Sequence, residues 1–328
     1  MPRISVVQLK LNMTLSRQPF LLREKSLTTT RTGSAMLRVV LADRTGAIGG
    51  VYFDVPGHVP DSLTVGQGVE VTGRVGEFKD QLQLNIERII PARLENPEEF
   101  LPLARRSIEE MAQEFDALRA SIENADLSRL LKTIFDDKTT YQAFTHAPAA
   151  KFNHHACVGG LLEHTLSVAR LVLTACELYP ELHCDLVLTV ALLHDLGKIR
   201  AYDPVSFDLT REGSLLTHLY SGAVQVERAI DALPGFGAEL RLQVIHALLS
   251  HHGKLENGSP VLPMTLEAIV LHYADNLDAD TRGALDHFQR SEGDGSIFTE
   301  YSSMHETKLY RRNQDSSSPA GPKQQSLL

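Results

Sequence analysis

The sequence contains little cysteine and no long apolar run. Its three cysteines, Cys157, Cys176 and Cys184, show no CxxC spacing and cannot all pair. We therefore interpret them as reduced packing residues and expect a cytoplasmic protein. No apolar run reaches the ~18 residues that a membrane-spanning helix needs. Residues 1–17 lack a continuous apolar segment with a small-residue cleavage site, which argues against secretion.

Charge and histidine are unevenly distributed along the 328 residues, a length that suggests two domains at about 150 residues each. Residues 1–94 carry 12 Lys/Arg and 8 Asp/Glu, a net charge of +4, whereas the remainder carries −13. Of the 14 histidines, 12 lie between His146 and His287. The pattern indicates a mildly basic module joined to an acidic, histidine-rich module, and the clustering is typical of a metal site.

The basic module has the pattern of a small β-barrel. Residues 19–92 contain about five short apolar segments separated by turns, with alternation at Leu37, Val39 and Leu41, a DRTG turn at 43–46 and glycines where a sheet must bend. The order of these features resembles OB-fold nucleic-acid-binding domains over residues 18–93. We therefore predict an all-β OB-fold barrel over residues 1–93.

An OB-fold barrel binds single strands through a basic groove and exposed aromatic rings. The candidate nucleic-acid-binding residues are Arg23, Lys25, Arg38, Arg74, Phe78 and Lys79. Phe20, Tyr52 and Phe53 are further candidates for stacking, although Tyr52 and Phe53 point to opposite faces of a strand and at most one faces outward. The alternative is that half of the aromatics form the barrel core and the charges form a solvated face. Proteins and sugars are also ligands of OB-fold barrels.

Residues 94–125 are predicted to form a helical linker. Two prolines in PARLENPEEF mark its start, and Ser107 with Glu110 suggests a capping box. One apolar stripe follows, made of Ile108, Met111, Phe115 and Leu118. The stripe is expected to pack against the next domain or against a second subunit.

Residues 126–290 have an all-helical pattern, organised around HDLGK at 194–198. Burying an unpartnered polar group costs roughly 2–7 kcal/mol, and more for a charge, so His194 and Asp195 at the end of an apolar helix need a partner. A divalent metal satisfies both, since imidazole and carboxylate suit Zn, Mn or Fe. Other apolar helices supply more such groups: His164, His218, His251 and Asp275. We also predict Gly197 as a helix C-cap and Gly222 as a point of close approach.

The order H…HD…D resembles the HD superfamily of metal-dependent phosphohydrolases over about 130 residues. By that resemblance one metal is held by His164, His194, Asp195 and Asp275, and a second metal adds His218 and His251. Helical periodicity does not decide between His251 and His252, and we favour His251. His246 and His272 are interpreted as packing residues or as residues that orient the ligands.

Several polar residues near these motifs have two readings. Asp195 and Lys198 are the candidate catalytic residues, but Lys198 is equally suited to interact with a helix dipole. His154 and His155 either contact a substrate phosphate or lie in a loop. Candidates for contacting the substrate or orienting the ligands are His154, His155, Glu163, His252 and Asp278.

Both halves together, with HHACVGGLLEHT, ALLHDLGKI, HLYSG, LSHHG and LHYADNLDA, closely resemble the YhaM-type 3′→5′ exoribonuclease family over residues 15–290. The family implies a manganese-preferring nuclease that shortens single-stranded RNA, and to some extent DNA, from the 3′ end. Two Mn²⁺ ions about 3.5–4 Å apart would activate a water and neutralise the phosphate, releasing nucleoside 5′-monophosphates. A homo-oligomer is a further candidate assembly. Residues 291–328 are predicted to be a disordered tail.

Three alternatives remain open from the residues. The first is an HD phosphohydrolase of free or cyclic nucleotides that uses the barrel for assembly. The second is a DNA- or RNA-binding factor with a degenerate HD site, which the full ligand set disfavours. The third, an alarmone or cyclic-dinucleotide hydrolase, lacks the GYP-like segment that would support it.

Overall fold

The N-terminal strands close into a barrel in the computed structural model, which describes residues 3–30, 33–78, 81–94, 97–151, 155–290 and 296–311. The strands are β1 (Thr14–Thr29), β2 (Ala35–Asp43), β3 (Gly46–Phe53), β4 (Gly68–Phe78) and β5 (Gln81–Ala92). They are ordered β1-β2-β3-β5-β4, and a parallel pairing of β3 with β5 closes the barrel. A short helix, α1 (His58–Ser62), joins β3 to β4 and packs Val59 into the core. The predicted OB-fold barrel is confirmed.

Alternation along β2 and β3 decides which side chains fill the barrel. Leu37, Val39 and Leu41 are all buried, as period-two spacing requires. Tyr52 packs against the core, whereas Phe53 next to it is 52% exposed. Phe20 is completely buried, so the expectation that it stacks on a strand is wrong.

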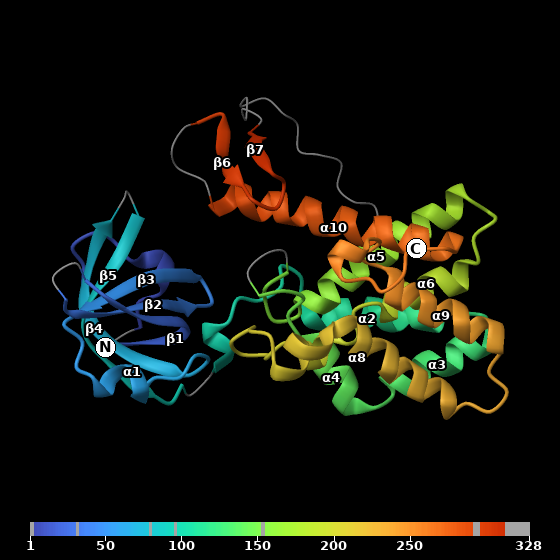
Figure 1. Ribbon diagram of the computed structural model, residues 1–328, viewed down its shortest axis with the longest axis horizontal. Coiled ribbons are helices and arrows are strands. Elements are labelled where there is room, and N and C mark those ends of the chain that lie inside the picture. Colours follow the sequence, from blue (N-terminus) through green and yellow to red (C-terminus); the bar gives the residue numbers. More distant parts are fainter. Residues whose placement is uncertain are drawn as a thin grey trace.

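Helices form the second domain, at the other side of the molecule in Figure 1. They are α2 (Ile108–Ala120), α3 (Ala125–Phe135), α4 (Lys138–His146), α5 (Gly160–Leu178), α6 (Cys184–Leu193), α7 (Lys198–Ala201), α8 (Arg211–Asp231), α9 (Ala238–Ser250) and α10 (Leu266–Arg290). None of the helices within the described ranges is long and apolar enough to cross a bilayer.

Helix α2 belongs to the core of this helical domain. Its hydroxyl cap is Ser107, whose Oγ accepts from the backbone N–H of Glu110. Met111 and Phe115 are fully buried in the same cluster as the later helices. Phe115 packs edge-on against Phe135, with ring centroids 4.8 Å apart, and also contacts Phe144. The apolar stripe therefore packs against the domain that follows it.

Residues 296–311 contradict the prediction of a tail without structure. Strands β6 (Phe298–Ser302) and β7 (Thr307–Tyr310) form a hairpin that lies over the C-terminal part of α10 (Figure 1). His305 Nε2 donates to the carbonyl of Asp280, and His287 Nε2 donates to that of Glu300. These contacts with α10 hold a hairpin whose own sequence gives little strand signal. Residues 291–295 and 312–328 lie outside the described part of the chain.

Gly197 does not end a helix in the left-handed conformation, so the prediction of a C-cap is wrong. Its φ is −63°, and it precedes α7. A Cβ at Gly197 would lie 2.0 Å from the carbonyl oxygen of His218 and 2.6 Å from the backbone nitrogen of Gly222. The glycine is needed because α7 and α8 touch backbone to backbone, and the close approach expected at Gly222 is confirmed.

Replacing Phe115 with alanine should destabilise the helical domain by about 3–5 kcal/mol, because the surrounding rings cannot collapse into the cavity. Urea unfolding followed by circular dichroism measures the change. Leu178→Ala, at a position 68% exposed at the end of α5, is the control and should change stability by less than about 0.5 kcal/mol. Equal effects of the two substitutions would contradict the packing described for α2.

Candidate metal centre

Histidines and carboxylates from separate helices meet at one buried centre. His164 lies in the early turns of α5, and His194 and Asp195 directly follow α6. His218 lies in α8, next to a break in the helix at Thr217 (φ 63°, ψ 160°). His251 and His252 follow α9, and Asp275 and Asp278 lie in α10. Each side chain occupies an ordinary helical or helix-end position, and the packing of the helices brings them together.

One group surrounds the Nε2 atom of His164. This atom is 3.2 Å from His194 Nε2, 3.1 Å from Asp275 Oδ1 and 3.4 Å from Asp195 Oδ2. His194 Nε2 is 3.3 Å from the same Asp195 oxygen. Two nitrogens and two carboxylate oxygens from three segments thus face a common point.

A second group lies on the other side of Asp195. Asp195 Oδ1 is 3.4 Å from His218 Nε2 and 3.8 Å from His251 Nε2. His252 Nε2 is 3.2 Å from His218 Nε2. Both His251 and His252 therefore face the centre, so the choice between them posed by helical periodicity is not exclusive in the structure.

Asp195 joins the two groups. Its side chain is 2% exposed, and within the described part of the chain neither carboxylate oxygen makes a hydrogen bond of normal geometry, although Lys198 Nζ forms an ion pair with Oδ2 at 2.7 Å. His251 Nε2 is likewise buried without a hydrogen-bond partner among these residues. Buried polar atoms are rarely left unsatisfied. These bare atoms and the mixed nitrogen and oxygen donor set fit a divalent cation such as Zn, Mn or Fe on each side of Asp195.

The outer ring nitrogens fix the orientation of the imidazoles. His194 Nδ1 donates to the carbonyl of Ala191, His251 Nδ1 to that of Leu248 and His252 Nδ1 to that of Asn257. His164 Nδ1 donates to Asp278 Oδ2 at 2.7 Å. With a proton on Nδ1, the neutral form of each ring presents the Nε2 lone pair to the centre, as metal-binding histidines require.

A buried polar network supports His164 from behind. Asp278 Oδ2 also contacts His155 Nε2 at 3.0 Å, and His155 Nδ1 lies 3.0 Å from Glu163 Oε2. Arg282 Nη2 is 3.5 Å from the same Glu163 oxygen. His155 is 5% exposed, and both of its ring nitrogens contact carboxylates of this network. Contact of His155 with a substrate stays a prediction. His154 lies outside the described residues.

Burial and neighbouring charges set the protonation states. Burial lowers the pKa of His218 to about 3 and also lowers that of His251, so both rings are neutral at pH 7. Burial would raise the pKa of Asp195, but Lys198 and His194 lower it well below its usual range. Burial would lower the pKa of His164, but Asp275 and Asp278 raise it to about 9. Metal binding needs deprotonated ligands. The Asp195 carboxylate and the neutral rings of His218 and His251 already meet this requirement, whereas a metal at His164 must displace a proton.

Sequence reasoning missed two residues at this centre. Arg282 is one, and its only signal is the four-residue spacing from Asp278 on α10. Gly253 is the other, with a φ of +77° and a backbone so close to the His272 ring that a Cβ would lie 2.1 Å from it. His272 Nδ1 donates to the carbonyl of His251, so Gly253 and His272 together fix the end of α9.

The barrel carries a groove on its outer surface, with a volume of about 480 Å³. Lys25, Arg38, Phe53 and Phe78 line it together with the β3 glycines. Phe53 and Phe78 are more than half exposed, which suits stacking of bases. Lys25 Nζ also donates to the carbonyl of Pro60 in α1. Three of the expected nucleic-acid-binding residues, Lys25, Arg38 and Phe78, thus share one groove.

The remaining barrel candidates lie elsewhere. Arg23 does not line the groove, because its guanidinium stacks over Phe207 of the helical domain. The prediction that Arg23 binds the strand in the groove is therefore corrected. Arg74 points outward from β4, outside the groove residues, and donates to Asn12 Oδ1. Lys79 lies outside the described residues.

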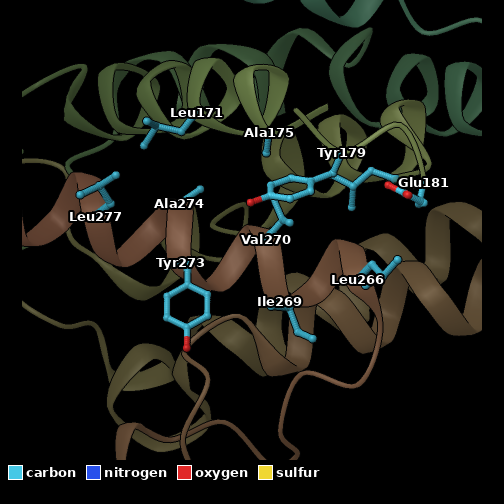
Figure 2. Close-up of a pocket in the computed structure, with 11 residues that line it drawn as sticks. Leu171, Ala175, Tyr179, Glu181, Leu266, Ile269, Val270, Tyr273, Ala274 and Leu277 are labelled. Atoms are coloured by element: carbon cyan, nitrogen blue, oxygen red, sulfur yellow. The ribbon is translucent and has the colours of Figure 1, made fainter. Parts of the chain in front are cut away.

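A separate apolar pocket of about 640 Å³ lies between α5 and α10 (Figure 2). Leu171 and Ala175 of α5 line one side, and Ile269, Tyr273 and Leu277 of α10 line the other. Among the described residues that line it, Glu181 is the only charged one. The pocket has no part in the histidine centre.

Comparison with known proteins supports both domains. Residues 161–280 match the HD domain family, and residues 22–92 match the OB-fold nucleic acid binding domain family. The 3′-5′ exoribonuclease YhaM of Geobacillus sp. (strain WCH70) is 35% identical over 256 residues, 75% of this chain and 76% of that protein. The protein of the same name from Listeria monocytogenes serotype 4b (strain F2365) is 35% identical over 265 residues, covering 79% and 84%.

Among solved structures, the second OB-fold domain of replication protein A from Methanococcus maripaludis covers 29% of this chain and 96% of its own, at 18% identity. Its TM-score of 0.23 is too low to carry an argument. The sequence relatives show the family, because at 35% identity the matched segments cover three quarters or more of this chain. The resemblance of the motifs is confirmed, and the chain belongs to the YhaM family of 3′-5′ exoribonucleases.

Proposed function

We propose that this chain is a divalent-metal-dependent hydrolase that shortens single-stranded RNA from its 3′ end and releases nucleoside 5′-monophosphates. The observation that carries the proposal is the position of Asp195, a buried carboxylate with one oxygen facing each of two imidazole groups. The relatives are named 3′-5′ exoribonucleases, and from them we infer the 3′-to-5′ direction and RNA as the substrate. Single-stranded DNA is a second candidate substrate, because an OB-fold groove stacks the bases of either strand.

Two cations, for which we favour Mn²⁺, would be held by the two groups. His164, His194, Asp195 and Asp275 would hold one, and Asp195 with His218, His251 and His252 would hold the other. When bound, such a pair supplies an activated water and neutralises charge on the phosphate. The fit is supported by the bare Asp195 oxygens and His251 Nε2.

The chain's own residues do the remaining work. Lys198 lies beside Asp195 with its side chain 11% exposed, so its ammonium can reach both the centre and a phosphate. Asp278 keeps the proton of His164 on Nδ1. The groove at Arg38 and Phe78 would hold the strand upstream of the 3′ end.

The runner-up is hydrolysis of free or cyclic nucleotides, with the barrel used for assembly. It shares the metal centre but predicts no dependence of activity on strand length. The exposed phenylalanines and the arginine of the barrel groove favour RNA. A binding factor with a degenerate HD site is disfavoured, because the described residues contain a complete set of donors.

Two smaller expectations stay predictions. Cytoplasmic location is supported by the three unpaired cysteine thiols. A homo-oligomer is supported by the α10 stripe of Leu266, Ile269, Tyr273 and Leu277, each at least 40% exposed beside the pocket in Figure 2.

Asp195→Asn should reduce RNA cleavage by more than about 100-fold, since changing residues that merely orient metal ligands already costs 10–100-fold. Binding of single-stranded RNA should be retained, because it is assigned to the barrel. The measurement is the ladder of shortened products from 5′-labelled RNA with Mn²⁺, alongside filter binding. Asp231→Asn, at an exposed ion pair with Arg241, is the matched control. Loss of binding in a folded Asp195→Asn protein would argue against the division between domains.

His252→Ala should lower the number of tightly bound Mn²⁺ ions from two to one. Equilibrium dialysis with elemental analysis measures this number without relying on activity. His246→Ala is the matched control on α9, because His246 Nε2 accepts from the backbone N–H of Met264 and lies outside the centre. Two ions at unchanged affinity in His252→Ala would remove His252 from the ligand set.

Phe78→Ala should weaken binding of single-stranded RNA by about 1–3 kcal/mol, the usual value of one base stacked on an aromatic ring. Arg38→Ala should weaken binding and flatten its salt dependence, because one phosphate contact is lost. Fluorescence anisotropy at several salt concentrations measures both. Arg74→Ala, outside the groove, is expected to have a much smaller effect, and a loss equal to that of Arg38→Ala would place the strand along β4 instead.

A further inference from the structure

The barrel contacts the helical domain at a loop, residues 202–210, between α7 and α8. Phe207 of this loop is completely buried. It packs in a cluster with Leu21 of β1 and with Leu94, Phe100 and Leu101 of the segment that leaves the barrel. A side chain from the helical domain is thus enclosed by residues of the barrel and its connection.

Arg23 of β1 completes this joint. Its guanidinium carbon is 4.6 Å from the centroid of the Phe207 ring, and Nη2 donates to the carbonyl of Lys151 at 3.4 Å. The register of β1 against β2 shifts between Leu22 and Glu24, so Arg23 is the extra residue of a β-bulge. Bulges re-aim side chains, and this one turns Arg23 toward the loop while Lys25 lines the groove.

The loop is held in one conformation by its own hydrogen bonds. Asp203 Oδ1 accepts from the backbone N–H groups of Val205 and Ser206, at 2.9 and 2.7 Å, and the Asp203 carbonyl accepts from Phe207 N–H. Phe207 has a φ of 61°, a left-handed conformation that is unfavourable for a bulky residue and persists where the surroundings fix it. Lys151 pairs with Asp208 at 2.6 Å.

Both ends of the loop continue into the metal centre. The segment before it is α7, which begins with Lys198 beside Asp195. The helix after it carries His218. A Cβ at Gly213 would lie 2.2 Å from the carbonyl oxygen of Ala201, so the two helices touch at the base of the loop as they do at Gly197. The loop, α7 and α8 therefore form one tightly packed unit.

We propose that Arg23 and Phe207 are positioning residues that hold the barrel groove in a fixed relation to the metal centre. This inference rests on the proposed RNA hydrolysis and adds a role for two residues that touch neither metal nor substrate. A strand long enough to occupy both the groove and the centre binds more tightly when the two are held in a fixed relation, because its second contact becomes intramolecular. An oligonucleotide that occupies only the centre does not gain affinity from this arrangement.

The test compares a 5′-labelled 20-nucleotide RNA with a trinucleotide as substrates of the full-length protein with Mn²⁺. Phe207→Ala and Arg23→Ala should each lower kcat/KM on the long RNA at least tenfold, mainly by raising KM. Both should leave kcat/KM on the trinucleotide within twofold of the unchanged protein. The double substitution should lose little more than either single one, because the two side chains act as one contact.

Arg17→Ala is the matched control, an exposed arginine of the same strand that pairs with Glu70; it should leave kcat/KM unchanged on both substrates. If Phe207→Ala does not fold, Phe207→Leu and Arg23→Ala carry the test. Equal losses on both substrates, or no loss on the long RNA, would overturn the positioning role. Failure of the proposed function is distinguishable, because the unchanged protein would then cleave neither RNA.

Discussion

The structure of the helical domain depends on one buried carboxylate. Asp195 has an oxygen toward His164 and His194 and another toward His218 and His251, with Lys198 as its only ion-pairing lysine among the described residues. A charge removed from water in this way is tolerated only if opposite charge compensates it. The packing of α5, α6, α8, α9 and α10 follows from this constraint, because each must bring a polar group to the same point without opening the apolar core around it.

That core and the centre place different demands on the same helices. Val190, Ala191 and Leu193 of α6 are fully buried, one turn or less before His194. The imidazoles of His194 and His251 donate to carbonyls at the helix ends, which would otherwise be unpaired. The same hydrogen bonds therefore orient the rings and satisfy the last carbonyls of the helices. A cation that binds only the folded arrangement adds its binding free energy to stability, and it offsets the destabilising burial of Asp195.

Local sequence patterns correctly predicted the features that depend on neighbouring residues in the chain. Alternation at Leu37, Val39 and Leu41 predicted the barrel, and histidines on apolar helices predicted the centre. Three of the failures involve distant contacts. Gly197 is required by the backbone of His218, not by the end of its own helix. Arg23 faces away from the groove because of a β-bulge that the residue types around it do not predict. The hairpin at 298–310 is held by α10. His251 and His252 both face the centre at the end of α9, a position for which helical periodicity had offered only one of them.

The opposite net charges of the two domains explain why a fixed contact between them matters for strand binding. Residues 1–94 carry +4 and the remainder −13, so a polyanionic strand is attracted to the barrel and repelled by the domain that would cut it. Carboxylates proposed to hold cations cannot be removed to lessen this repulsion. A barrel on a loose tether would leave the strand end free to avoid the acidic domain, whereas a barrel fixed by Phe207 and Arg23 brings the bound strand to the metal centre at constant geometry. Salt screens both the attraction of the strand to the barrel and its repulsion from the helical domain. The fixed arrangement of the two domains does not depend on salt in this way.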